Sequence, residues 1–230
     1  LSSRGKGVRP LLVLLSAALN APAGGRGIGQ RTYLAAMLVE IIHTASLIHD
    51  DVIDEADTRR GRASANAKWQ SRNAVVLGDY LLARNMELGM RSGQYDLVSY
   101  VIASIATLCE GELLQSDRAE RMEITRDAYL EIIYKKTASL LGISAGVGAL
   151  SAGANREQVA RMRRFGDALG MAFQIQDDIL DFTRGAETGK PSNNDLREHK
   201  ITLPLLLLLD RADAARRDEL LALLARCRED

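Results

Sequence analysis

Two short acidic motifs, DDVID and DDILD, carry the residues best suited to chemistry in this sequence. Their carboxylates belong to Asp50, Asp51, Asp54, Asp177, Asp178 and Asp181. The first and last aspartates of each motif are four residues apart, so a helix would place them on one face. Two carboxylates about 6 Å apart repel each other by about 3 kcal/mol at an effective dielectric constant of about 20. A divalent cation would remove this cost, and ligation by oxygen alone favours Mg²⁺ or Mn²⁺. The alternative for either motif on its own is a solvated acidic helix end.

Basic residues near these motifs predict a ligand that carries a diphosphate. The basic residues in question are Lys6, Arg9, Arg59, Arg60, Lys136, Lys190 and Lys200. Mg²⁺ bound by one or two carboxylates usually takes its other ligands from phosphate oxygens, and arginine and lysine bind the oxygens that remain. One alternative is that Arg59 and Arg60 only neutralise nearby aspartates. Another is that Lys135 and Lys136 form an ordinary solvated pair.

Helices must position both motifs. Apolar residues recur at spacings of three and four almost throughout the chain, which is typical of amphipathic helices. The pattern predicts helices from Arg31 to about Asp54 and over 73–91, 95–115, 126–150, 156–183, 202–212 and 214–227. Asn155 and Gln158 form a predicted capping box at the start of the 156–183 helix. No alternating strand pattern occurs, so the sequence predicts one all-α domain.

Composition limits the classes of function. The chain has 230 residues, of which 47% are hydrophobic and 26% charged, and its formal net charge is zero. A net charge of zero argues against nucleic-acid binding through bulk positive charge. The two cysteines, Cys109 and Cys227, cannot build a disulfide framework, and a cytoplasmic location fits this usage. No run of about 18 uncharged apolar residues occurs, so we predict no transmembrane segment.

Six stretches of the sequence carry a family resemblance. They are, in order, GKGVRP, HTASLIHDDVIDEADTRRG, LGDYLLAR, KKTASL, AFQIQDDILD and GKPSNNDLREHKITLP. In these stretches, which span nearly the whole chain, the sequence resembles the trans-isoprenyl diphosphate synthases, or polyprenyl synthetases. The resemblance implies an all-α helical bundle around a deep central cavity, of the isoprenoid synthase type, in a homodimer. It also implies an Mg²⁺-dependent prenyltransferase that joins isopentenyl diphosphate head to tail to an allylic diphosphate.

The resemblance also assigns roles to residues. Asp50 and Asp54 would ligate two Mg²⁺ ions, and Asp177 would ligate a third. Three further aspartates would bind these ions directly or through water: Asp51, Asp178 and Asp181. The allylic diphosphate would be held by Arg59, Lys136, Lys190 and Lys200, with Thr137 and Gln174 close to the reacting carbons. Isopentenyl diphosphate would be held by Lys6, Arg9, His43 and Arg60. Spacing alone places His43 on the same helical face as Asp50; the alternative for His43 is an ordinary core residue.

The sequence departs from the family pattern in three places. Asn193 stands where the family loop usually has glycine, and asparagine tolerates a left-handed backbone. The familiar EGK is replaced by Glu198-His199-Lys200, which keeps the lysine. The chain starts just before GKGVRP and stops at Asp230, whereas members of the family carry more helix at both ends. We therefore expect a single prenyl-synthase domain over residues 1–230 that lacks helical segments at both ends.

Small residues before the first motif predict a long product. In the family, bulky aromatic residues four and five positions before this motif stop chain growth, whereas Ser46 and Ala45 are small. We therefore expect a long-chain all-trans polyprenyl diphosphate of the kind used for quinone side chains. The alternative function is that of a geranylgeranyl or farnesyl diphosphate synthase. The alternative role of the two small residues is only to let two helices approach closely.

Two other classes of protein remain as alternatives. A terpene cyclase would need only one diphosphate site, which would leave Lys6, Arg9 and His43 without a role. A non-catalytic partner subunit of a prenyl synthase typically lacks one aspartate motif, whereas both motifs are intact in this sequence.

Overall fold

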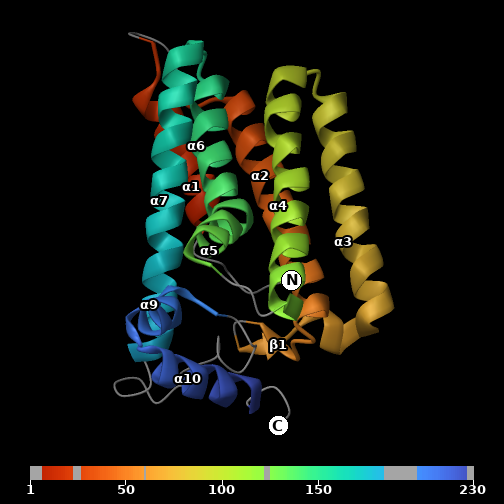
Figure 1. Cartoon of the computed structure of the whole chain (residues 1–230). Coiled ribbons are helices and arrows are strands. Elements are labelled where there is room, and N and C mark those ends of the chain that lie inside the picture. The colour runs from red at the N-terminus through yellow and green to blue at the C-terminus, as the bar shows by residue number, and fades with distance from the viewer. Residues whose placement is uncertain (1–6, 23–26, 60, 122–124, 184–200, 227–230) are drawn as a thin grey trace.

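The chain folds into a bundle of α-helices, as the sequence predicts (Figure 1). The computed structural model describes residues 7–22, 27–59, 61–121, 125–183 and 201–226. Its helices are α1 (Val8–Leu19), α2 (Gln30–Ile53), α3 (Ala65–Arg91), α4 (Tyr95–Arg121), α5 (Arg126–Ile133), the π-helical turn η1 (Tyr134–Ala138), α6 (Ser139–Ser151), α7 (Arg156–Thr183), α9 (Leu203–Arg211) and α10 (Ala214–Arg226). Between α2 and α3, two short strands pair antiparallel: β1 (Thr58–Arg59) and β2 (Arg62–Ala63).

The structure differs from the predicted elements in three regions. Helix α1 was not predicted, because its sequence is apolar on nearly every side and contains Pro10; proline is tolerated in the first turn of a helix. Helix α3 begins at Ala65, where Ser64 caps it by accepting a hydrogen bond from the backbone N–H of Ala67 at 2.9 Å. The backbone at Gln70 (φ 65°, ψ 153°) then interrupts the helix, so its continuous part starts close to the predicted 73. The predicted helix over 126–150 contains η1, and the β1–β2 pair lies where the sequence shows no strand pattern.

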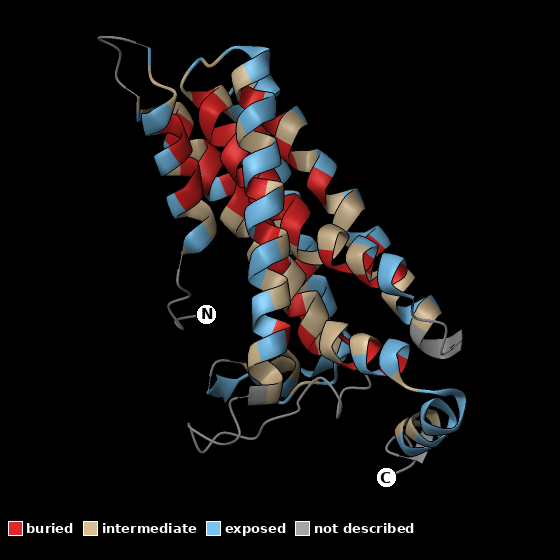
Figure 2. Cartoon of the chain, turned by 60° about the vertical axis from the view of Figure 1, so that its left-hand side comes forward, coloured by how far each residue is buried: buried red, intermediate tan, exposed pale blue. Residues whose placement is uncertain are grey.

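The core of the bundle forms around α2 and α6. The main cluster of buried side chains joins these two helices to α1 and α4, and its members are Val13, Ala35, Ala36, Leu38, Val39, Ile42, Leu97, Val98, Val101, Leu140, Ile143 and Val147. Figure 2 shows the buried residues gathered along the inward faces of the bundle. Helix α6 is buried over almost its whole length. Its glycines let other helices approach closely: a Cβ on Gly148 would lie 2.3 Å from the carbonyl oxygen of Val13.

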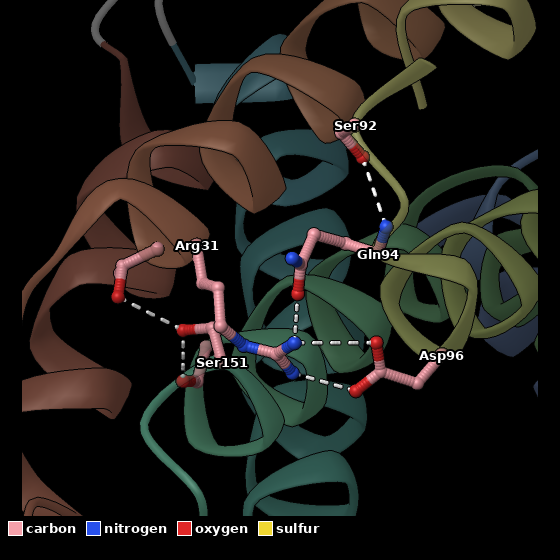
Figure 3. A network of polar contacts seen from close by, with 7 residues as sticks. Arg31, Ser92, Gln94, Asp96 and Ser151 are labelled. Carbon is pink, nitrogen blue, oxygen red and sulfur yellow. Dashed lines mark hydrogen bonds and ion pairs between the residues drawn. The ribbon is translucent and has the colours of Figure 1, made fainter. Parts of the chain in front are cut away.

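Polar contacts fix the end of the bundle where α2 begins (Figure 3). Arg31 on α2 donates hydrogen bonds to Gln94 in the α3–α4 connection and to Asp96 on α4, the latter at 2.6 Å. The hydroxyl of Ser151, the last residue of α6, donates to the hydroxyl of Thr32 at 3.0 Å. At the opposite end of the bundle, α2 terminates near β1 and α7 terminates near α9 (Figure 1), so both acidic motifs belong to this end.

Among the described residues, two helices have the length and composition expected of a membrane span. They are α2 and the Tyr95–Arg118 part of α4, with windows of mean hydropathy 1.3 and 1.5. In α2, 44% of that window is buried inside the bundle, because residues such as Leu38, Val39 and Ile42 belong to the core. In α4 the buried share is 22%. The absence of a transmembrane segment therefore stays a prediction.

Candidate active site

The first acidic motif forms the last turn of α2. Asp50 is half-buried, Asp51 is buried and Asp54, the C-cap residue, is exposed. The Nε of Arg59, on β1, donates a hydrogen bond of 2.6 Å to Oδ1 of Asp51. The β1–β2 turn, which contains Gly61 at φ 75°, folds this arginine back towards the helix. Arg59 therefore does neutralise an aspartate of the motif, and the ion pair fixes its position beside Asp50.

Asp50 lies in an environment that disfavours negative charge. Burial raises the pKa of Asp50 to about 6, and the nearby carboxylates of Glu112 and Asp54 add to the shift. Lys136 and Arg59 act in the opposite direction, but they do not cancel it. A cation would relieve this cost, so the electrostatics of Asp50 match the predicted role in metal binding.

A pocket of about 530 Å³ opens beside Asp50, between α2, α3, α4 and η1. Its polar lining includes Arg9, His43, Asp50, Glu112, Lys136 and Thr137. Its apolar lining includes Leu47, Val75, Leu108, Leu113 and Leu140. The pocket thus combines cations and carboxylates, which suit a diphosphate with its metal ions, with an apolar surface, which suits a hydrocarbon chain.

Ser46 and Ala45 do not play the same part in this pocket. Ser46 lines it, whereas Ala45 is fully buried in the bundle and is not among the lining residues. Successive residues of an α-helix point about 100° apart, since a turn takes about 3.6 residues, so only one of this pair faces the cavity. Of the two small residues before the first motif, Ser46 is the one on the pocket wall, and Ala45 packs in the core.

The turn η1 presents Lys136 and Thr137 to the pocket. The Nζ of Lys136 lies 2.6 Å from Oε1 of Glu112 and donates a hydrogen bond of 3.0 Å to Oε1 of Gln115, both on α4. Gly111 allows this close approach, because a Cβ there would lie 2.9 Å from the Cγ of Lys136. Lys136 is therefore held by two half-buried partners, which argues against a solvated surface pair. Short π-helical turns inside helices are frequent at functional sites.

The second acidic motif lies near the end of α7. Asp177 is exposed, Asp178 is buried and Asp181 is half-buried. Burial raises the pKa of Asp178, hydrogen bonds from Tyr129 and Gln174 oppose that rise, and the neighbouring aspartates add to it. Among the residues that line the pocket described above, none belongs to this motif.

A chain of hydrogen bonds connects the pocket to the second motif. The hydroxyl of Thr137 donates to Oε1 of Gln174 at 2.8 Å, and Nε2 of Gln174 donates to Oδ1 of Asp178 at 2.8 Å. Thr137 and Gln174, which the resemblance places close to the reacting carbons, are thus in direct contact. Through Thr137, η1 is thus bonded to the residue beside the second motif, and it lines the same pocket as Asp50 of the first motif.

Arg9 and His43, both predicted to bind isopentenyl diphosphate, are in contact. Nη1 of Arg9, in the first turn of α1, lies 2.9 Å from Nε2 of His43 on α2, and both side chains line the pocket. This contact places His43 in a polar setting and argues against an ordinary core histidine. The remaining predicted basic residues, Lys6, Arg60, Lys190 and Lys200, lie outside the residues that the structure describes.

Three residues in contact with the site were not predicted. Glu112 and Gln115 hold Lys136, and Tyr129 donates a hydrogen bond of 2.6 Å to Asp178. A weak signal existed for the first two: carboxylate and amide side chains interrupt the otherwise apolar face of the 95–115 helix at a spacing of three. For Tyr129 there was none, because its partner lies 49 residues away in the sequence.

The donor set suits a hard divalent ion. The six predicted metal ligands all offer carboxylate oxygens, which is the chemistry that Mg²⁺ prefers. Within the described part of the chain, no three acidic, histidine or cysteine side chains lie close enough to hold one ion between them. An ion bound by one or two of these carboxylates would complete its coordination with water or phosphate oxygens.

Fold and site together define a protein of the isoprenoid synthase type: an α-helical bundle with two acidic helix ends and a lysine–threonine turn that lines the pocket beside the first of them. The chain belongs to the polyprenyl synthetase family, whose model matches residues 1–230.

Known proteins support this assignment. The chain is 36% identical to a short chain isoprenyl diphosphate synthase of Methanothermobacter thermautotrophicus, over 97% of this chain and 69% of that protein. A crystal structure of a decaprenyl diphosphate synthase from Rhodobacter capsulatus matches with a TM-score of 0.85 and 41% identity, over 94% of this chain and 65% of that one. A crystal structure of a polyprenyl synthase from Caulobacter crescentus, complexed with calcium and isoprenyl diphosphate, matches with a TM-score of 0.82 and 36% identity, over 98% and 71% of the two chains. The chain thus spans about two thirds of the length of these proteins.

Proposed function

We propose that this protein is an Mg²⁺-dependent prenyltransferase that condenses isopentenyl diphosphate with an allylic diphosphate, head to tail. The observation that carries the proposal is the pocket beside Asp50, which brings Lys136 and the Arg9–His43 pair together with an apolar lining. Membership of the polyprenyl synthetase family supports it. The complex of a related polyprenyl synthase with calcium and isoprenyl diphosphate supports a site for divalent ions and diphosphates.

The side chains suggest how the reaction proceeds. The aspartates of both motifs would hold the ions, and bound Mg²⁺ supplies charge neutralisation for the departing diphosphate. Arg59 and Lys136 would bind oxygens of the allylic diphosphate, so that its C–O bond breaks to give an allylic cation and free diphosphate. Arg9 and His43 would hold isopentenyl diphosphate with its double bond close to that cation. The new C–C bond then forms, and a proton leaves the adjacent carbon, with the released diphosphate as the acceptor that we propose.

The apolar lining of the pocket supports a long product. Leu108 and Leu140 line the pocket and also pack within or against the main core cluster, so they stand where the open cavity meets the packed core. Ser46 leaves space on the wall next to Asp50. The similarity to a decaprenyl diphosphate synthase also supports a long-chain all-trans product. The similarity to a short chain synthase keeps geranylgeranyl or farnesyl diphosphate as the alternative.

We also propose that the protein acts as a homodimer. Helices α3 and α4 lie side by side at one edge of the bundle (Figure 1), and their exposed side chains include Val76, Tyr80, Met90 and Tyr95. A second copy would remove this apolar surface from water. Light scattering at micromolar concentration tests this: a dimer supports the proposal, and a monomer contradicts it.

A cytoplasmic location completes the proposal, and the use of two cysteines without a disulfide framework supports it.

The decisive experiment is incorporation of labelled isopentenyl diphosphate into prenyl products in the presence of an allylic primer and Mg²⁺. A terpene cyclase would consume the primer without incorporating label, and a non-catalytic partner subunit would do neither.

A further inference from the structure

Tyr129 on α5 lies against the second acidic motif, although it belongs to none of the motifs that the sequence singles out. Its side chain is 3% exposed and packs with Ile133 and Leu206 in a small core cluster. Its hydroxyl donates a hydrogen bond to Oδ2 of Asp178 at 2.6 Å. Hydroxyl-to-carboxylate bonds of about 2.5–2.7 Å are the charge-assisted kind, which are about twice as strong as neutral ones. Tyr129 therefore binds Asp178 through its hydroxyl in addition to packing its ring in the core.

Both carboxylate oxygens of Asp178 have a donor. Oδ2 accepts from Tyr129 on α5, and Oδ1 accepts from Gln174, one turn earlier on α7. Asp178 is only 5% exposed, so these bonds form in a setting where an unmet carboxylate would be costly. Donors on two different helices therefore fix the orientation of this carboxylate.

The hydrogen bonds of Asp178 also fix the orientation of the Gln174 amide. Thr137 donates to the amide oxygen of Gln174, so the amide nitrogen must face Asp178. The last turns of α7 are thus tied to η1 by Thr137 and to α5 by Tyr129. Asp177 and Asp181, the other two aspartates of the motif, lie on the same turns of the helix.

We propose that Tyr129 is a positioning residue for prenyl transfer: by holding Asp178, it sets the last turns of α7 so that Asp177 and Asp181 can present their carboxylates to divalent ions. The inference rests on the proposed function and extends it to a residue outside the motifs. Tyr129 acts through Asp178 and needs no contact with substrate.

Tyr129→Phe tests the inference, because it keeps the ring in the core and removes only the hydroxyl. We expect the dissociation constant for Mn²⁺, measured by electron paramagnetic resonance with inorganic diphosphate present, to rise about 10-fold, since outer-shell partners of metal ligands typically contribute about 10–100-fold. The KM for isopentenyl diphosphate should stay close to that of the wild type, whereas the thermal midpoint should fall by a few degrees, because the buried Oδ2 of Asp178 loses its donor. Tyr134→Phe is the matched control, because that hydroxyl contacts Arg163 instead of an aspartate of either motif and its loss should leave Mn²⁺ binding unchanged.

Two outcomes would overturn the inference. One is a dissociation constant for Mn²⁺ in Tyr129→Phe that lies within about twofold of the wild-type value, which is about the size of additivity errors. Tyr129 would then have only a packing role. The other is an additive effect of Tyr129→Phe on Mn²⁺ binding in an Asp178→Ala background, where no oxygen remains to accept from the hydroxyl and an effect transmitted through Asp178 should vanish. Mn²⁺ binding needs no turnover, so failure of the wild type to make prenyl products would count against the proposed function and not against this inference.

Discussion

The hydroxyl of Thr137 lies 2.8 Å from the amide oxygen of Gln174, and this contact joins the two halves of the site. Thr137 lines the same pocket as Asp50, whereas Gln174 donates to Asp178 of the second motif. The π-helical turn η1 changes the phase of the helix at this point and so decides where Thr137 points. The wide turn is therefore part of the site and not an irregularity in the helix.

Removal of a metal-binding carboxylate should abolish most turnover. We expect Asp50→Ala and Asp177→Ala each to lower kcat by about 100-fold or more, because each removes charge that would hold an ion at the departing diphosphate. Helix content, measured by circular dichroism, should not change. Asp96→Ala at the far end of the bundle is the control and should keep wild-type kcat. Wild-type turnover in Asp177→Ala would contradict a third ion held by the second motif.

Two basic residues should separate the two diphosphate sites. Arg9→Ala should raise the KM for isopentenyl diphosphate by about 10-fold or more, since a hydrogen bond to a charged group contributes about 1.5–3 kcal/mol. Lys136→Ala should raise the KM for the allylic primer instead. Steady-state kinetics with each substrate varied in turn measure both values. Equal effects of both variants on both substrates would show that this division of the basic residues is wrong.

The stability of the metal-free protein should depend on pH through Asp50. Its pKa is raised to about 6 in the folded state from 3.8, so the folded state binds a proton that the unfolded state has released between these values. The ionised carboxylate therefore costs folding free energy above pH 6, and below 3.8 the cost is absent. We expect Asp50→Asn to raise the thermal midpoint by a few degrees above pH 6, measured in chelator, and this gain to fade as the pH falls towards 3.8. A gain that grows on acidification would contradict this assignment.

Product length should respond to Ser46 more cleanly than to Ala45. Ser46→Phe should place a ring in the pocket and shorten the product, as chromatography of the dephosphorylated chains will show. Ala45→Phe should instead destabilise the fold by about 1–3 kcal/mol or more, because Ala45 is 0% exposed and the core has no space for a ring. Unchanged product length in Ser46→Phe would mean that the growing chain does not pass this wall.

The helical fold could be predicted because its signals are local. The apolar spacing of α2 and α7 and the capping box at Asn155 are properties of short segments, and the reciprocal bonds of Asn155 and Gln158, both at 2.9 Å, confirm that box. The start of α3 escaped prediction because its first turns are polar and lack an apolar stripe. The turn η1 escaped because a π-helical turn leaves no mark in a three-and-four pattern.

The site was predictable only in part, for a related reason. The aspartates show themselves through their spacing within single helices. The contacts that orient them, from Arg59 to Asp51 and from Tyr129 to Asp178, depend on how separate elements pack. The same holds for Ala45, since which side of α2 faces the cavity is decided by α1, α4 and α6 together.

The most direct test of the account is the product made from labelled isopentenyl diphosphate and an allylic primer, with and without Mg²⁺. We predict Mg²⁺-dependent incorporation into all-trans chains longer than geranylgeranyl, and no incorporation when a chelator is present. Consumption of the primer without incorporation of label, or incorporation that persists in the chelator, would contradict the account.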